Sequence, residues 1–291
     1  MKPDLKSVLM GLLVTFLWSS SYIFIKFGLD ELSPFFFAAV RYSLASTILL
    51  LASFIKRKKI FLNRKLSLYF VVVGFLGYTV AQGFQFVGLS LLPAVTVTFL
   101  LNFNAFFVLI LGLIFLKEKP SKIQYIGFPL ALLGAYTYFQ ESLAFTNPLG
   151  ILVICLSGLA WASYMVLVRY LQRTKKVNSM GLTMISMGLG ALGLLIISFF
   201  LEGFQPISSK GWLIIIWLST INTAFAFYMW NHILKSIPAY RLSILQNTML
   251  VQIGLLSVFF LDEVITVNMI LGILLVLSGV ILVQMKAKSK K

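Results

Sequence analysis

The chain has 291 residues, of which 60% are hydrophobic and only 11% are charged. A soluble domain carries about twice that charged fraction, so the composition excludes an ordinary water-soluble protein. The formal net charge of +16 suits a nucleic-acid-binding protein only if the basic residues form one patch, and here they are spread over many short segments. We therefore expect an all-α integral membrane protein that lies in a lipid bilayer and binds no nucleic acid.

Ten apolar segments follow one another along the chain, and we expect each to cross a hydrocarbon core of about 30 Å as a helix. In the first half they lie near residues 7–27, 34–55, 66–89, 94–116 and 123–139. In the second half they lie near residues 149–168, 180–201, 211–234, 242–261 and 266–285. The sequence thus predicts two five-helix units, 1–140 and 149–291, joined by a linker at 141–148.

The basic residues predict how these helices are oriented, because Lys and Arg in short loops favour the cytoplasmic side of a membrane. With the amino terminus in the cytoplasm, all of the 24 Lys and Arg except Lys26, Arg41 and Lys210 fall in inner segments. Most acidic residues fall in the outer loops. We therefore expect a multi-pass protein of the plasma (inner) membrane with both termini in the cytoplasm.

The two halves are related in sequence. Residues 93–137 align without gaps to residues 238–282, so that Asn102 corresponds to Asn247 and Glu118 corresponds to Glu263. Each half has an odd number of expected spans, so the two halves should be inverted with respect to one another in the membrane. Many secondary transporters are built from such inverted repeats, with the substrate site near the midplane between them.

Several short motifs follow one another along the chain. They are Trp18 to Lys26 (WSSSYIFIK), Pro34 with Arg41 and Tyr42, Leu116-Lys-Glu118 with Gly127 and Gly134, Trp161-Ala-Ser-Tyr164 with Arg169, and Leu261-Asp-Glu263 with Gly272 and Gly279. In this order the chain resembles the drug/metabolite transporter superfamily, in particular its EamA-type members with two tandem repeats. The resemblance implies a ten-helix exporter or exchanger of small metabolites, with amino acids and related compounds among the substrates and with no cofactor.

Polar and aromatic residues within the expected spans are the candidates for a substrate site, because polar side chains in a membrane usually face the protein interior or a cavity. We expect the following to contribute to a central pocket: Trp18, Ser20, Tyr78, Gln82, Gln85, Thr98, Asn102, Trp161, Asn222, Tyr228, Trp230, Ser243, Gln246 and Asn247. The alternative is that some of them only form hydrogen bonds between helices, each worth about 0.6 kcal/mol.

Two charged residues are further candidates. Arg41 lies seven residues after Pro34, hence roughly 10 Å into the second span, and is interpreted either as a partner for a substrate carboxylate or as a structural partner of Asp30 or Glu31. His232, the only histidine, either couples transport to protons or forms a structural hydrogen bond. We expect Glu118 and Glu263 to pair with nearby lysines or to cap the following helices rather than to act in gating.

The alternatives to a metabolite transporter are a membrane enzyme, a scaffold or sensor, and a lipid-headgroup flippase. An enzyme would need His, Cys, Asp or Glu clustered at nucleophile or metal-ligand spacing, and the chain has one His and one Cys. We therefore expect no enzyme and no metal site, and we expect alternating access as the mechanism. The flippase remains open, because an apolar lateral opening would favour it. The oligomeric state is left open.

Overall fold

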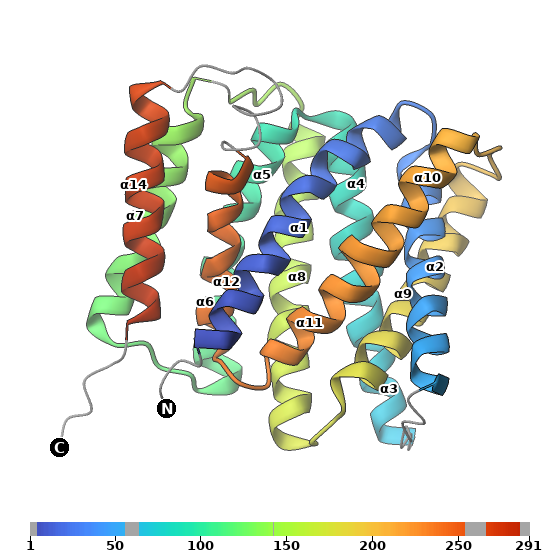
Figure 1. Ribbon diagram of the computed structural model, residues 1–291, viewed down its shortest axis with the longest axis horizontal. Helices are drawn as coiled ribbons and strands as arrows, with labels where there is room; N and C mark the ends of the chain where they lie inside the picture. The colour runs from blue at the N-terminus through green and yellow to red at the C-terminus, as the bar shows by residue number, and fades with distance from the viewer. Residues whose placement is uncertain (1–4, 56–63, 142, 254–265, 286–291) are drawn as a thin grey trace.

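The computed structural model describes residues 5–55, 64–141, 143–253 and 266–285, and every regular element in these ranges is a helix (Figure 1). In the first half they are α1 (Leu5–Leu29), α2 (Pro34–Ile55), α3 (Arg64–Gly74), η1 (Phe75–Val80), α4 (Ala81–Leu91), α5 (Ala94–Asn102), α6 (Asn104–Leu111), η2 (Gly112–Leu116) and α7 (Lys122–Phe139). In the second half they are α8 (Pro148–Thr174), α9 (Ser179–Leu201), α10 (Ser209–Trp217), η3 (Leu218–Phe225), α11 (Ala226–Ile233), α12 (Ala239–Ser243), η4 (Ile244–Asn247) and α14 (Val267–Gln284).

Eight continuous helical runs of the described chain are long and apolar enough to cross a membrane. They correspond to the expected spans one to four, six to eight, and ten. The fifth expected span is observed as α7, a regular helix of 18 residues that is not among those eight. The ninth is described only as far as residue 253, and the remainder of that span, with Glu263, lies outside the described residues. The structure is thus that of an integral membrane protein built from helices.

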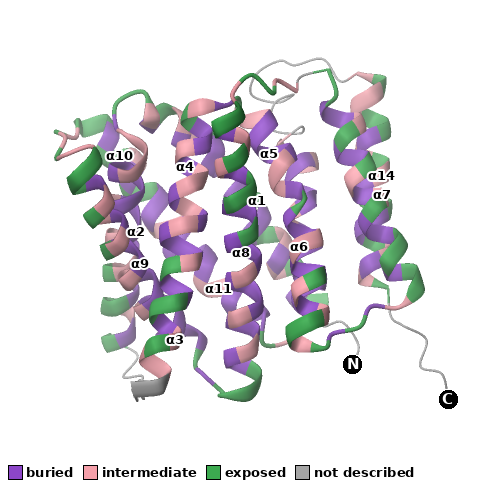
Figure 2. Ribbon diagram, turned by 180° about the vertical axis from the view of Figure 1, so that it is seen from behind, coloured by how far each residue is buried: buried purple, intermediate pink, exposed green. Residues whose placement is uncertain are grey.

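Burial in this protein reverses the usual arrangement of a soluble domain. Large apolar side chains lie on the outside, as with Phe54 at 71% exposure and Phe200 at 77%, whereas Asn222 and Asn231 are fully buried. In Figure 2, α8 in the middle of the molecule has a larger share of buried residues than α14 at one end. This distribution fits a surface that faces lipid, where exposed polar groups are costly.

The helix starts follow from local sequence signals. α8 begins at Pro148, a residue whose fixed φ suits the first helical position, and the Asn147 side chain accepts a hydrogen bond of 3.0 Å from Gly150 N. The Gln124 side chain accepts from Ser121 N at the start of α7. Its amide nitrogen donates to Val283 O at 2.9 Å, so the same residue that caps α7 also ties it to α14.

α7 and α14 lie side by side at one end of the molecule (Figure 1). Their contact is made by glycines that pair crosswise: a Cβ added to Gly127 would lie 2.6 Å from Gly279 O, and one added to Gly134 would lie 2.8 Å from Gly272 O. Small residues at such positions let membrane helices approach closely. Because the first glycine of α7 meets the second glycine of α14, the two helices run antiparallel.

Irregular helical turns interrupt several of the long helices. They occur at equivalent positions of the two halves, which are 145 residues apart in the sequence. The π-helical segment η1 at Phe75–Val80 corresponds to positions 220–225, which lie inside the π-helical segment η3. α5 ends at Asn102, and η4 ends at the corresponding Asn247. π-helical turns are often found at functional sites, and broken helices near the midplane are typical of transporter binding sites. Some of the helices near the centre of the molecule are therefore irregular, at related positions of the two halves.

Candidate functional site

A cavity of about 70 Å³ lies between the two halves, and helices α1, α2, α4, α8 and α11 all contribute to its wall. Typical small-molecule pockets hold about 300–1,000 Å³. The structure therefore has a narrow central cavity that is smaller than a typical small-molecule pocket. The candidate residues that line it are Trp18, Arg41, Gln82, Gln85, Thr98, Asn102, Trp161 and Gln246.

One side of the cavity is aromatic. The ring centroids of Trp18 and Trp161 are 5.7 Å apart, and Phe227 lies 5.3 Å from Trp18 and 5.7 Å from Trp161, all in edge-on geometry. Trp18 Nε1 donates to Asn222 O at 3.1 Å, and Trp161 Nε1 donates to Gln246 Oε1 at 3.1 Å. Each indole is thus fixed by a hydrogen bond to the other half of the chain or to a neighbouring helix, so the wall is preorganised.

Another part of the lining is polar. Gln82 and Gln85 of α4 line the cavity, and Gln82 Oε1 accepts a hydrogen bond of 2.7 Å from Tyr42 OH. That contact leaves the Gln82 amide nitrogen as a donor. The Asn104 amide lies 3.0 Å from that of Gln246, so a second pair of amides meets at the break between α5 and α6.

Arg41 lies on this polar side and is only 3% exposed. Its Nε donates to Thr223 Oγ1 of η3 at 2.7 Å, and its guanidinium carbon lies 5.5 Å from the ring centroid of Tyr42 and 5.7 Å from that of Phe86. The expected alternative, a pairing of Arg41 with Asp30 or Glu31, is wrong. Glu31 lies in the α1–α2 connection and accepts hydrogen bonds from Ser208 N and Oγ instead.

The other candidates lie outside the cavity lining. Tyr78 OH shares a hydrogen bond of 2.9 Å with Tyr164 OH. Asn222 donates to Ser20 Oγ and Ser21 Oγ, and Trp230 is fully buried behind Trp18, 4.8 Å between centroids. Of the remaining four, Ser243 donates a hydrogen bond to Tyr240 O and Asn247 is 1% exposed. Tyr228 is half-buried, and the exposed His232 lies beside the Tyr228 ring.

Half of the lining was not singled out from the sequence. These residues are Ser21, Tyr22, Ile25, Leu101, Asn104, Ser157, Phe227 and Met249. Helical spacing carries a signal for some of them, because Ser21 and Ile25 are three and seven residues after Trp18 and Ser157 is four residues before Trp161. Asn104 follows the break after α5, so regular spacing could not assign it to this face.

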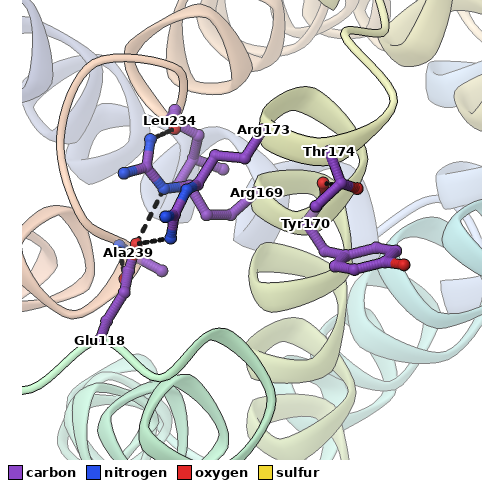
Figure 3. A network of polar contacts seen from close by, with 7 residues as sticks. All are labelled: Glu118, Arg169, Tyr170, Arg173, Thr174, Leu234 and Ala239. Carbon is purple, nitrogen blue, oxygen red and sulfur yellow. Dashed lines mark hydrogen bonds and ion pairs between the residues drawn. The ribbon is translucent and has the colours of Figure 1, made fainter.

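At the end of the molecule predicted to be cytoplasmic, a buried ion-pair network joins four elements (Figure 3). Glu118, which follows η2, accepts from Arg169 Nε at 3.0 Å and from Arg173 Nη1 at 3.4 Å, both on α8. Its other oxygen accepts from Ala239 N at the start of α12, at 2.9 Å. Arg169 also donates to Leu234 O after α11. We expected Glu118 to pair with nearby lysines or to cap the following helix, and the structure corrects both parts. Glu118 pairs with arginines because α8 brings them close to it, and it caps α12 rather than α7.

A comparable contact occurs at the end of α1. Lys26 Nζ donates to Leu89 O and to Leu92 O, the latter at 3.1 Å. Leu89 and Leu234 are separated by the same 145-residue offset that relates the two halves. α1 and α8 end at opposite ends of the molecule (Figure 1). A basic residue near the end of each helix therefore binds the backbone at corresponding positions, Leu89 in α4 and Leu234 directly after α11.

Comparison with known proteins places this fold. The EamA-like transporter family matches residues 5–140 and again residues 148–285. An uncharacterized transporter of Archaeoglobus fulgidus is 29% identical over 240 residues, which are 79% of this chain and 81% of the relative. The "Probable amino-acid metabolite efflux pump" of Escherichia coli is 24% identical over 286 residues, 94% of this chain and 93% of the relative.

A solved crystal structure has the same fold, with a TM-score of 0.80 over 96% of this chain and 98% of that chain at 18% identity. The membrane-spanning helices fit the transport function for which the matched family is named. The family match occurs twice in succession and covers almost the whole chain, and so the protein belongs to the EamA-like transporter family.

Proposed function

We propose that the protein is a secondary-type transporter that exports or exchanges small metabolites by alternating access between two inverted five-helix halves. The observation that carries this proposal is the central cavity, which is lined by polar and aromatic side chains of both halves and is narrower than a metabolite needs. Opening toward one face and then the other is the simplest way for such a site to exchange its contents.

The inverted arrangement is supported by three features that relate the halves. The glycines of α7 and α14 pair crosswise, the π-helical segments η1 and η3 overlap under the sequence offset, and Lys26 and Arg169 bind corresponding backbone carbonyls. On this basis we propose ten spans in the plasma membrane with both termini in the cytoplasm, so that the Glu118 network closes the inner end of the pathway.

Efflux of amino acids or related compounds is the proposed substrate range. Its support is the name of the Escherichia coli relative, which is similar over nearly the whole chain at 24% identity. We also propose that the protein is not an enzyme. The described cavity lining contains Ser21 and Ser157 but no His, Cys, Asp or Glu, so a serine there has no imidazole or carboxylate in the described lining to act as its general base.

A lipid-headgroup flippase is the second candidate, and one observation favours it. An apolar groove of about 980 Å³ opens between α5–α6 and α7, with Phe99, Phe103, Phe106, Tyr125 and Tyr136 in its wall. Such a groove has room for an acyl chain while a headgroup passes through the protein. Leu101 and Asn102 of the same broken helix line the central cavity, so one helix separates the groove from the polar site.

Counterflow in proteoliposomes tests the proposal. Purified protein is reconstituted, the vesicles are loaded with one of a panel of amino acids, N-acyl amino acids and short carboxylic acids, and entry of the labelled compound is followed. Saturable uptake that is stimulated by the internal compound supports the transporter. Phe200→Leu on the exposed surface serves as the matched control. Absence of flux for the whole panel, together with movement of fluorescent phospholipid between leaflets, would replace the first candidate with the second.

A further inference from the structure

The central cavity contains a buried cation without a counter-ion in the part of the chain that the structure describes. Arg41 is 3% exposed, and Nε is the only guanidinium nitrogen with a hydrogen-bond partner among the described residues. The described ion pairs all involve Glu118 at the inner end. An uncompensated charge in such a place is costly. Retaining it fits a site whose counter-ion arrives with the ligand.

The surroundings of Arg41 fix the direction of its free edge. Thr223 holds Nε, and the rings of Tyr42 and Phe86 flank the guanidinium at 5.5 and 5.7 Å. The two terminal nitrogens remain as parallel donors beside the cavity. That pair matches the two oxygens of a carboxylate in a bidentate contact.

The other polar groups on this side add donors but no second charge. The Gln82 amide nitrogen is left free by the bond from Tyr42, and Gln85 has no hydrogen-bond partner among the described residues. Arg41 is the one charged side chain in the described lining. A single cation balances a carboxylate monoanion, whereas a phosphate dianion needs more positive charge.

The geometry points to a carboxylate-binding site at Arg41 that makes small organic monoanions the substrates, with the carboxylate on Arg41 and the apolar part of the molecule against the Trp18–Trp161 wall. This inference rests on the proposed transport function and adds the chemical class of the substrate. A free ammonium group finds no carboxylate in the described lining, so the site favours N-acylated or amine-free acids over zwitterionic amino acids.

Paired probes test the inference. N-acetyl-L-tryptophan, N-acetyl-L-leucine and phenylacetate are each compared with the corresponding primary amide, which has nearly the same shape and no charge, by thermal stabilisation of the detergent-solubilised protein. Phenyl phosphate and the free amino acids tryptophan and leucine complete the set. We expect at least one carboxylate to bind tenfold or more tightly than its amide, its free amino acid and phenyl phosphate. We expect Arg41→Gln to abolish that preference and Arg41→Lys to retain part of it.

Lys210→Gln is the matched control, because it removes one exposed basic charge that is not part of the cavity lining. It should leave the preference unchanged. If Arg41→Gln fails to fold, the inference is still tested by comparing carboxylate and amide binding in the unmodified protein and in Arg41→Lys. The inference is overturned if the acids and amides bind equally or if no acid and no amide binds. It is also overturned if phenyl phosphate or a free amino acid binds more tightly than the carboxylates, or if Arg41→Gln keeps the preference for the acid. Counterflow of neutral and charged compounds alike would overturn the carboxylate site and leave the transporter standing.

Discussion

The carboxylate of Glu118 accepts a hydrogen bond of 2.9 Å from the backbone N–H of Ala239, although the two residues are 121 positions apart. The contact joins the segment after η2 to the start of α12, and the arginines of α8 meet the same carboxylate. Three segments that surround the central cavity are therefore held together at one end by a single side chain. Glu118 is 9% exposed, so this contact is made largely out of water.

Replacing Glu118 by Gln should open the inner end. The change leaves Arg169 buried without its counter-ion, which costs roughly 3 kcal/mol for a buried pair. We expect a lower melting temperature in detergent. In a Cys155→Ser background with Ser157→Cys as the reporter, we also expect several-fold faster labelling of that cysteine by an impermeant maleimide from the inner side. Glu141→Gln, which removes an exposed carboxylate bonded to Asn268, is the control. Unchanged labelling would contradict a gating role for the network.

Gly127→Ala should weaken the contact between α7 and α14. The new methyl group would lie 2.6 Å from Gly279 O, a backbone atom that can move only if the helices separate. We expect a loss of roughly 1–3 kcal/mol, seen as a lower melting temperature. The matched control is Gly112→Ala, whose Cβ meets nothing within 4 Å and should be neutral. Equal melting temperatures for both variants would mean that the two helices are not held by this close approach.

Trp161→Phe should weaken substrate binding without preventing folding. Phenylalanine keeps an aromatic surface but removes the indole N–H that donates to Gln246, so the amide of Gln246 loses its fixed position. One neutral hydrogen bond contributes about 1 kcal/mol, and we expect a roughly fivefold rise in the counterflow KM. Trp212→Phe on the exposed part of α10 is the control. An unchanged KM in Trp161→Phe would remove this wall from the binding site.

Stability should depend on pH through Glu31. Hydrogen bonds from the Ser208 backbone N–H, then from its hydroxyl, lower the pKa of the Glu31 carboxyl below its ordinary value. A depressed pKa in the folded state adds stability above the unfolded pKa, and this is lost as the pH falls through the folded pKa. The difference in melting temperature between the unmodified protein and Glu31→Gln should therefore be larger at pH 7 than at pH 3.5. An equal difference in melting temperature at pH 7 and pH 3.5 would show that the folded protein does not favour the ionised form of Glu31.

The spans could be predicted because the requirement of lipid is local: about 20 apolar residues are enough to define one. The cavity could be predicted only where helices are regular. In a regular helix the spacing of Tyr78, Gln82 and Gln85 puts all three on one face. Gln82 and Gln85 do line the cavity, whereas Tyr78 meets Tyr164. Tyr78 lies in the π-helical segment η1, whose wider turn rotates it away from the face that a regular α-helix would give it.

Contacts between distant segments were beyond the reach of the sequence for a different reason. The partner of Arg41 is Thr223, which lies 182 positions later in another π-helical segment. The partners of Glu118 are arginines on α8, although lysines lie beside it in sequence. In both cases many partners are sterically reasonable until the packing of the helices is known.

The crosswise glycines of α7 and α14 have an energetic consequence for the proposed cycle. Exchanging the two halves turns the Gly127–Gly279 contact into the Gly134–Gly272 contact, so this glycine pairing is mapped onto itself. In the proposed cycle the glycine pairing would contribute equally to the inward-facing and outward-facing states and would favour neither. The difference in free energy between the two states must therefore come from contacts that the exchange does not reproduce, and a substrate shifts the balance only by binding one state more tightly.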